Sequence, residues 1–437
     1  MSPALMATLM VVSFMVFLLL GFPVAFCLIG VSVMLGAIFL GPEVLYAFYS
    51  NAFSTLMVDV YIAVPLFVFM AAVLQNSGIG SDLYSVMYSW FAGIRGGLAI
   101  GSVVIATLIA AMTGLAGTDV VVMGILAYPE MRKRSYDKVI AIGCIPAGGA
   151  LGPLIPPSII MIIIGALSHL SVGRLFSGGL FPGLLMSTLF IIYIAVRCWC
   201  QPHLAPAVPF EERATWKEKI ISLRYIILPI MLVLFVLGAI YSGMCTPSEA
   251  GGAGAFGTLI IAAIHRQLNW KNLKESTLLT LRLVSMLIWL LIGGVCFSSL
   301  MTMSGVSHFI CDTLTGMAVN PMVIIVAMML LSLFMGMIMD TSAITMILVP
   351  IFVPIVIDLG VDPLWFFLLF TISLIVGYIS PPFGMNLFYT KGILPPDVTM
   401  MDIWRSASPY TLCMIGVLIV GLLYPPLLLW LPSTMIK

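Results

Sequence analysis

Two aspartates, Asp119 and Asp340, stand in otherwise apolar stretches beside glycines and hydroxyl-bearing residues. Glycines let backbones approach each other, and hydroxyl and carboxylate oxygens suit a hard cation such as Na⁺. The candidate cation ligands are Thr113, Gly114, Gly117, Thr118 and Asp119 in the first stretch and Gly336, Asp340, Thr341 and Ser342 in the second. Each aspartate could instead cap the helix that follows it, and the two roles are compatible.

Two double prolines, Pro156-Pro157 and Pro381-Pro382, interrupt long apolar runs. Each pair removes two amide donors and disfavours helix at the residue before it. We therefore expect a short non-helical stretch at each pair, whose carbonyls lack helical partners and can face a ligand. The candidate substrate-binding residues are Pro156, Pro157, Ser158, Pro381, Pro382, Gly384 and Asn386, and Ser380 joins the candidate Na⁺ ligands.

The composition places these residues in a membrane. The chain has 437 residues, of which 62% are hydrophobic and 8% are charged, and its mean hydropathy is +1.20. Soluble domains are about 25% charged, so a soluble enzyme, a nucleic-acid binder and a disordered chain are excluded. The net charge of +1 gives no attraction to nucleic acid. We predict an all-α polytopic membrane protein with room for about a dozen segments. An acid inside such a segment is a functional-site hypothesis.

Charge indicates that two long segments turn back on themselves. Segment 97–131 has basic residues at both flanks, whereas segment 320–357 has only acidic flanks. The positive-inside rule then predicts two re-entrant hairpins, the first opening to the cytoplasm and the second to the outside. Each precedes a broken helix that holds a double proline, at about 138–168 and about 363–391. Threading the chain this way places 16 of the 18 basic residues inside.

The two halves of the chain share this pattern. Pro156 and Pro381 are 225 residues apart, and so are Pro129 and Pro354, which precede them. The pattern predicts a first repeat over 1–205, a cytoplasmic linker over 206–224 and a second repeat over 225–437. Because the hairpins open to opposite sides, the repeats are inverted. Inverted repeats with broken helices that meet near the bilayer midplane are typical of secondary transporters.

Four motifs together resemble a known family, the large membrane subunit of tripartite ATP-independent periplasmic (TRAP) transporters. They are Thr113-Gly-Leu-Ala-Gly-Thr-Asp119, Gly152-Pro-Leu-Ile-Pro-Pro-Ser158, Met335-Gly-Met-Ile-Met-Asp-Thr341 and Ser380-Pro-Pro-Phe-Gly384. The resemblance implies an inner-membrane elevator-type transporter of the ion transporter superfamily, which couples organic-acid uptake to Na⁺. It also implies two partners, a small four-helix membrane subunit and a periplasmic substrate-binding protein, and no cofactor apart from the coupling ion.

Other functions stay open at this point. A stand-alone divalent-anion/Na⁺ symporter of the same superfamily would need no binding protein. An intramembrane aspartyl protease would use Asp119 and Asp340 as a dyad that shares a proton, and a passive channel would need a continuous pore. No phosphate-binding loop of the G-x-x-x-x-G-K-[ST] type occurs, so ATP drive is excluded. No pair of histidines has metal-ligand spacing, so we expect no metal other than Na⁺.

Three short stretches, 82–92, 304–315 and 399–406, are too short or too polar to span and are expected to lie at the membrane interface. The last span is expected over 408–432.

Overall fold

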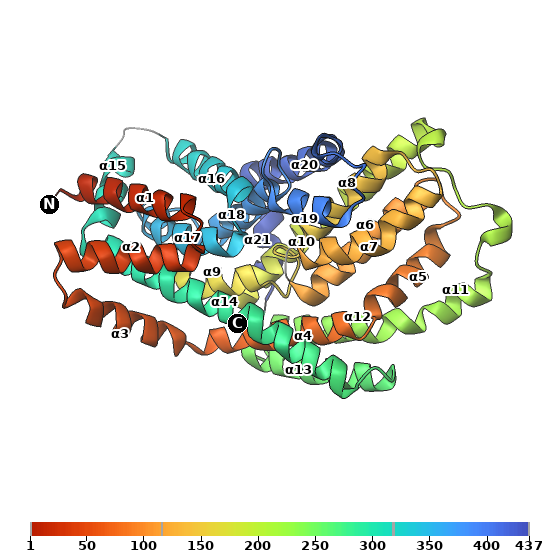
Figure 1. The fold of residues 1–437 in the computed structure, drawn as a ribbon, viewed down its shortest axis with the longest axis horizontal. Coiled ribbons are helices and arrows are strands. Elements are labelled where there is room, and N and C mark those ends of the chain that lie inside the picture. Colours follow the sequence, from red (N-terminus) through yellow and green to blue (C-terminus); the bar gives the residue numbers. More distant parts are fainter. Residues whose placement is uncertain (1, 115–116, 317–319, 436–437) are drawn as a thin grey trace.

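The computed structural model describes residues 2–114, 117–316 and 320–435, and these form helices without any strand (Figure 1). The first half contains α1 (Pro3–Leu19), α2 (Val24–Phe39), α3 (Val44–Leu56), η1 (Asp59–Ile62), α4 (Ala63–Asn76), α5 (Ile79–Phe91), α6 (Gly97–Thr113), α7 (Thr118–Lys133), α8 (Lys138–Gly149), α9 (Ile159–Ser168) and α10 (Val172–Cys200). Then come η2 (Pro202–Leu204), η3 (Phe210–Glu212), α11 (Trp216–Ser222), α12 (Arg224–Tyr241), α13 (Pro247–Ile264), α14 (Trp270–Met303), α15 (Val306–Gly316), α16 (Pro321–Ile338), α17 (Thr341–Asp358), α18 (Pro363–Tyr378), α19 (Met385–Ile393), α20 (Met400–Leu423) and α21 (Pro426–Ser433).

Six stretches of the described chain are helical, long and apolar enough to cross a membrane, and a bent pair of helices would make a seventh. The six are Asp59–Asn76, Val172–Cys200, Trp270–Met303, Pro321–Ile338, Thr341–Asp358 and Met400–Leu423. Shorter apolar helices, such as α1, α2, α6 and α18, add to them. The expectation of an all-α polytopic membrane protein is therefore confirmed.

The order of helices repeats along the chain. Moving α9 by the 225 residues that separate the double prolines places it on α19, and the same shift moves α6 onto α16. In the same way α1, α2, α5, α7, α8 and α10 fall on α12, α13, α15, α17, α18 and α20. The long α14 corresponds to α3 and α4 together. The short helix α11 lies in the stretch expected to link the two halves.

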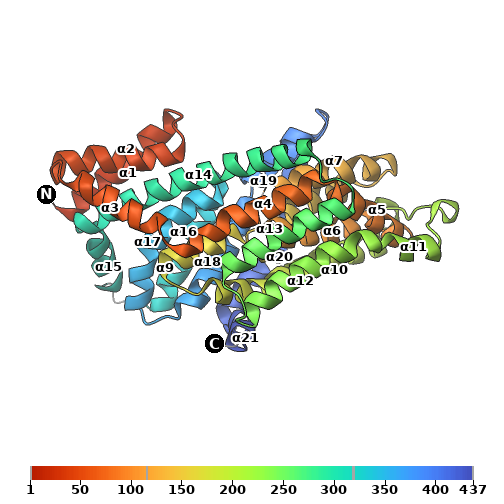
Figure 2. The ribbon, with the colours of Figure 1, turned by 90° about the horizontal axis from the view of Figure 1, so that it is seen from below.

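The helices form two packed groups. In one group α2 and α4 pack against α14, and α13 packs against α4 and α12. In the other, α8 packs between α6 and α20, while α18 packs between α16 and α20. The α6–α7 pair and the α16–α17 pair lie on opposite sides of α10, α18 and α19 (Figures 1 and 2). Each pair is an antiparallel hairpin whose tip points towards this centre, which is where the two broken helices also change direction.

The structure corrects two of the segment boundaries. The span expected over 408–432 is two helices, because the chain leaves α20 at Tyr424 and starts α21 after Pro425. The stretch 399–406 is not a separate interfacial arm. Thr399 and Asp402 form a reciprocal capping box that starts α20 at Met400, so these residues are the first turns of a long helix.

Candidate functional site

The tip of the first hairpin joins α6 to α7 through Gly114 and Gly117. Both glycines have positive φ, +60° and +90°, a conformation that favours glycine. The Thr113 hydroxyl donates to Oδ1 of Asp119 across the tip, with an oxygen–oxygen distance of 2.9 Å. Both side chains are buried. Leu115 and Ala116 lie outside the described residues, as does the side chain of Thr118.

Asp119 is not the cap of α7, since Gly117 occupies that position and no side chain caps the helix. The carboxylate lies in the first turn, where the partial positive charge of the helix N-terminus favours an anion. A cavity of about 40 Å³ adjoins Thr113 and Asp119, with Gln75 of α4 on its wall. That volume is enough for a single water or ion.

The first hairpin tip sits directly on the first break. A Cβ atom at Gly114 would collide with the carbonyl oxygen of Pro157, so only glycine permits this approach. The break runs from the end of α8 at Gly149 to Ser158, the cap of α9, and Pro156-Pro157 is a cis peptide bond. Every residue of this break is buried.

Ser158 is held within the break by its own hydroxyl. Its Oγ accepts from the Met161 amide at 3.3 Å and donates to the Pro153 carbonyl at 2.5 Å. The residue therefore starts α9 as a helix cap, in addition to any contact with a ligand. Because the Ser158 hydroxyl already donates its proton to the Pro153 carbonyl, a ligand could contact only the hydroxyl oxygen.

The second hairpin tip has a different cap. Oδ2 of Asp340 accepts from the Ser342 amide at 2.9 Å. This aspartate therefore caps α17, which confirms the capping role predicted for it. Thr341 begins the helix and is buried. A Cβ at Gly336 would lie 2.9 Å from the Leu374 carbonyl oxygen and 3.2 Å from Cα of Gly377, so α16 is pressed against α18.

The second break runs from Ile379 to Gly384 and holds the cis Pro381-Pro382 bond. The Ser380 hydroxyl donates to the Val376 carbonyl at 2.6 Å, and the Gly384 amide donates to the Ser380 carbonyl at 3.0 Å. Unlike the first break, this one is open, because Pro382 is exposed and Phe383 keeps 56% of its surface accessible.

Helix α19 connects the two halves. The Asn386 amide nitrogen donates to the Pro146 carbonyl of α8 at 3.1 Å. Asn386 is fully buried, and its Oδ1 has no hydrogen-bond partner in the described part of the chain. A buried acceptor without a donor is costly, typically about 1–3 kcal/mol. This oxygen is therefore available to a ligand.

Two tyrosines that the sequence analysis did not select complete the connection. Tyr389 of α19 lies against Gly117, where a Cβ would be 2.8 Å from the tyrosine ring. The hydroxyl of Tyr378, at the end of α18, is within interaction distance of Asp340 and of Tyr389. The first tip, α19, the end of α18 and the second tip thus form one continuous set of contacts. The sequence offered one signal for this connection, namely that Tyr378 stands directly before the Ile-Ser-Pro-Pro stretch.

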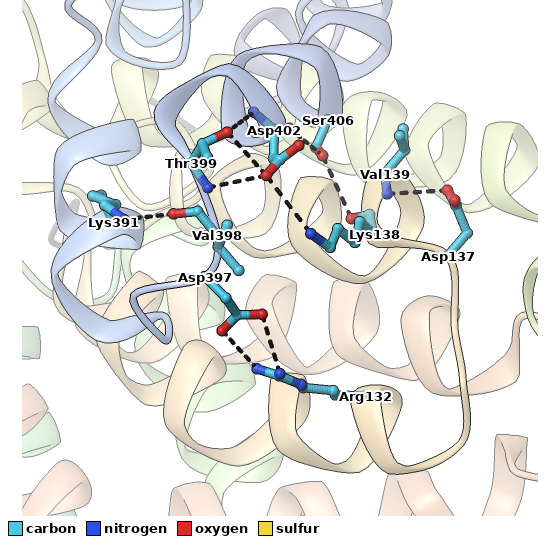
Figure 3. A network of polar contacts seen from close by, with 10 residues as sticks. All are labelled: Arg132, Asp137, Lys138, Val139, Lys391, Asp397, Val398, Thr399, Asp402 and Ser406. Atoms are coloured by element: carbon cyan, nitrogen blue, oxygen red, sulfur yellow. Dashed lines mark hydrogen bonds and ion pairs between the residues drawn. The ribbon is translucent and has the colours of Figure 1, made fainter.

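A polar network fixes the position of α19 and α20 relative to α7 and α8 (Figure 3). Arg132 and Asp397 form an ion pair at 3.1 Å, and Lys138 and Asp402 form another at 3.8 Å. The Lys391 ammonium donates to the Val398 carbonyl. The network gathers three basic residues that the charge pattern placed on one side of the membrane.

The protease dyad finds no support in this geometry. Asp119 is engaged with Thr113, and Asp340 is engaged with the α17 amide and lies near Tyr378. Within the described residues, no group of three or more His, Cys, Asp or Glu could hold a metal ion.

An apolar cavity beside the first break is unsuited to an anion. It has a volume of about 470 Å³ and lies between α12, α6 and α10, beside Pro156. Its hydroxyl groups are already engaged within the protein, since Thr107 contacts Ser187, Ser177 donates to the Arg174 carbonyl, and Tyr241 contacts Thr434. A charged substrate would gain no polar partner there.

Residues 11–427 match the family described as the DctM component of the tripartite ATP-independent periplasmic transporter. The C4-dicarboxylate TRAP transporter large permease protein DctM of Pseudomonas aeruginosa is 30% identical over 410 residues, which cover 93% of each chain. The 2,3-diketo-L-gulonate large permease protein YiaN of Escherichia coli is 28% identical over 84% of this chain and 85% of its own. The ectoine large permease protein TeaC of Halomonas elongata is 26% identical over 98% and 99%.

Two solved structures share the fold. The YdaH transporter of Alcanivorax borkumensis has a TM-score of 0.66 and 15% identity, covering 94% of this chain and 98% of its own. MtrF of Neisseria gonorrhoeae has a TM-score of 0.58 and 12% identity, covering 87% and 84%.

Proposed function

Because this chain belongs to the DctM family, the large permease component of TRAP transporters, we propose that it couples the uptake of an organic acid to Na⁺. The chain is a multi-pass protein of the inner membrane and is a transporter subunit rather than an enzyme.

The observation that carries the proposal is that both tips and both breaks meet. Gly114 lies on Pro157, and Asn386 of the second half bonds to α8 of the first half. Gly117 and Asp340 are joined through the two tyrosines described above. In a bilayer, non-helical backbone is tolerated only inside protein or beside a water-filled cavity. Two such stretches at one point, with two carboxylates, form the centre expected of a secondary transporter.

We assign Na⁺ to the two hairpin tips and to Ser380 of the second break. Several of these hydroxyls donate their proton to a protein oxygen, which leaves the oxygen lone pairs directed elsewhere and able to meet a cation. Thr113 and Ser380 are examples. The proposed residues are Thr113, Gly114, Gly117, Thr118, Asp119, Gly336, Asp340, Thr341, Ser342 and Ser380.

We assign the organic acid to the breaks. No Lys or Arg occurs in 97–131, 139–173 or 283–390, so the anion must be met by neutral donors. Four helices, α7, α9, α17 and α19, start at the tips and breaks, and their amide N-termini favour negative charge. The proposed substrate-binding residues are Pro156, Pro157, Ser158, Pro381, Pro382, Gly384 and Asn386. The relatives are named for a C4-dicarboxylate, a diketo acid and ectoine, which gives the class to be tested.

The two halves differ in a way that supports alternating access. Helix α12 packs against α13 and α5, just as its counterpart α1 packs against α2 and α15, but α12 also contacts α6 and α10. Helix α5 packs along α6, whereas its counterpart α15 packs against α17. Pro157 is buried and Pro382 is exposed. We infer that 1–205 and 225–437 are inverted repeats, and that α6–α10 and α16–α20 move as an elevator against α1–α4 and α12–α14. If the two halves exchanged these surroundings, the binding site would open to the opposite side of the membrane.

The partners follow from the family. We propose that a small four-helix membrane subunit joins this chain and that a periplasmic binding protein delivers the substrate. A symporter without a binding protein is the competing function.

Reconstitution of this chain into liposomes, with the small subunit and binding protein encoded beside it, tests the proposal. We expect radiolabelled succinate, or another acid of a C4-dicarboxylate, keto-acid and sugar-acid panel, to accumulate only with an inward Na⁺ gradient. An equal K⁺ gradient is the control. Full uptake without the binding protein would favour the competing symporter, and uptake independent of Na⁺ would refute the coupling.

A further inference from the structure

A second binding site is indicated on the exposed surface of the helix group that contains α10 and α20. A groove of about 620 Å³ runs along the second half of α10 and is closed on one side by Cys413 of α20. We call it the α10–α20 groove. Leu189, Ile192 and Val196 form its apolar wall, and Arg197 with Gln201 closes the end nearest the helix C-terminus.

Arg197 is held in place but is not neutralised. Its Nη1 donates to the Tyr193 hydroxyl at 2.7 Å, and the guanidinium lies 5.9 Å from the centre of the Tyr193 ring. Tyr193 in turn packs on the buried ring of Tyr410 at 5.2 Å. No ion pair of Arg197 occurs among the described residues, and its Nε is buried without an acceptor there. Asp137, the carboxylate at the start of neighbouring α8, caps that helix through the Val139 amide.

The groove is apolar along most of its length and positively charged at one end, an order that matches a molecule with an apolar chain and an anionic head. The apolar wall lies towards the middle of a span, and the guanidinium lies at its last turn. Trp199, next to it, is 81% exposed, as expected of an aromatic residue at the level of lipid headgroups. The positive-inside rule places this end of α10 at the cytoplasmic surface. A basic pocket between helices on that side suits an anionic headgroup.

We propose that the α10–α20 groove binds an anionic phospholipid. The phosphate accepts hydrogen bonds from the guanidinium of Arg197, whose planar set of donors suits a phosphate group. One acyl chain lies along Leu189, Ile192 and Val196. The lipid supplies the acceptor that the described chain does not, and it covers an apolar wall that a free phosphate would leave bare. This site is separate from the hairpin tips and does not depend on the proposed transport chemistry.

The test uses the complex with the small subunit, purified and delipidated in detergent. Palmitoyl-oleoyl phosphatidylglycerol is added, and retained lipid is counted by native mass spectrometry. Arg197→Gln should weaken the tightest phosphatidylglycerol binding at least tenfold. Arg197→Lys, which keeps the charge but loses the planar fork, should weaken it less. Lys217→Gln removes an exposed positive charge elsewhere and should leave binding unchanged. Equal retention in Arg197→Gln and the unmodified protein would overturn the proposal.

The labelling rate of Cys413 by a maleimide, resolved by peptide mass spectrometry, tests the location. Phosphatidylglycerol should slow labelling in the unmodified protein and not in Arg197→Gln. Three results would overturn the proposal. They are equal protection by phosphatidylcholine, equal protection by glycerol 3-phosphate without acyl chains, and full protection by the small subunit without lipid. The last would make this groove a protein interface.

Discussion

Replacing Asn386 by leucine separates ligand binding from stability. The buried Oδ1 has no partner in the described structure, so its removal should recover about 1–3 kcal/mol in the ligand-free protein. The lost bond to the Pro146 carbonyl is worth about 0.5–1.5 kcal/mol. That carbonyl keeps its helical partner, the Ala150 amide at 3.1 Å, so no acceptor is left unpaired.

The free energy of unfolding of Asn386→Leu should therefore lie between about 0.5 kcal/mol below and about 2.5 kcal/mol above that of the unmodified protein. Leucine has the same branched outline as asparagine and bulkier end groups, so no cavity forms. Uptake per folded molecule of a hydroxyl-bearing acid should fall at least tenfold, because the substrate hydroxyl loses the Oδ1 acceptor to which a carboxylate has no proton to donate. Trading stability for function is expected at a binding site.

Thermal unfolding and uptake are measured on the same preparation. Thr390→Val is the matched control, because Thr390 is also buried on α19 and its hydroxyl only bonds back to the Asn386 carbonyl. The control should keep both properties near normal. If Asn386→Leu is clearly destabilised and its uptake falls only with the amount of folded protein, Asn386 is structural and the reasoning fails.

The remaining predictions concern the tips and the polar network. Gly114→Ala should destabilise the protein by about 1–3 kcal/mol, because the new Cβ meets the Pro157 carbonyl and the residue has positive φ; an unchanged melting temperature would contradict the close approach. Asp340→Asn should keep the helix cap and the stability without Na⁺, yet raise the Na⁺ concentration for half-maximal uptake; unchanged Na⁺ dependence would leave Asp340 with the cap alone. Hydrogen bonding to Arg132 holds the pKa of Asp397 below its usual 3.8, so the ion pair stabilises the folded state above that pH and this contribution is lost as pH falls through the lower, folded pKa. Asp397→Asn should therefore lower the melting temperature slightly at pH 7 and not at strongly acidic pH, and an equal effect at both pH values would refute this.

The breaks and tips were predictable because proline and glycine act locally. The double prolines remove donors wherever they stand, so the interruptions of α8–α9 and α18–α19 follow from the sequence. The capping role of Asp340 was likewise one of two stated expectations. The similar sequence around Asp119 gives a different result, because Gly117 stands at the cap position of α7 and Asp119 lies two residues later, in the first turn, where it accepts from Thr113.

Contacts between distant segments were not predictable. Asn386 could be selected as a polar residue after a break, but its bond to Pro146 depends on how α19 packs against α8. Tyr378 and Tyr389 were missed because an aromatic residue in a membrane helix usually only packs. The division at Tyr424 lies at Pro425-Pro426, a further double proline that the expected span 408–432 ran through, although the same local argument applies to it.

The most direct test of the central claim is the accessibility of the two breaks from the two sides of the membrane. Single cysteines replace Pro157 and Phe383 in a background without the native cysteines, and an impermeant maleimide is added to oriented proteoliposomes. The account predicts reciprocal labelling: position 383 reacts from one side while position 157 is protected, and conditions that drive turnover expose position 157 to the other side. Labelling of both positions from the same side, unaffected by Na⁺ or substrate, would contradict alternating access between inverted halves.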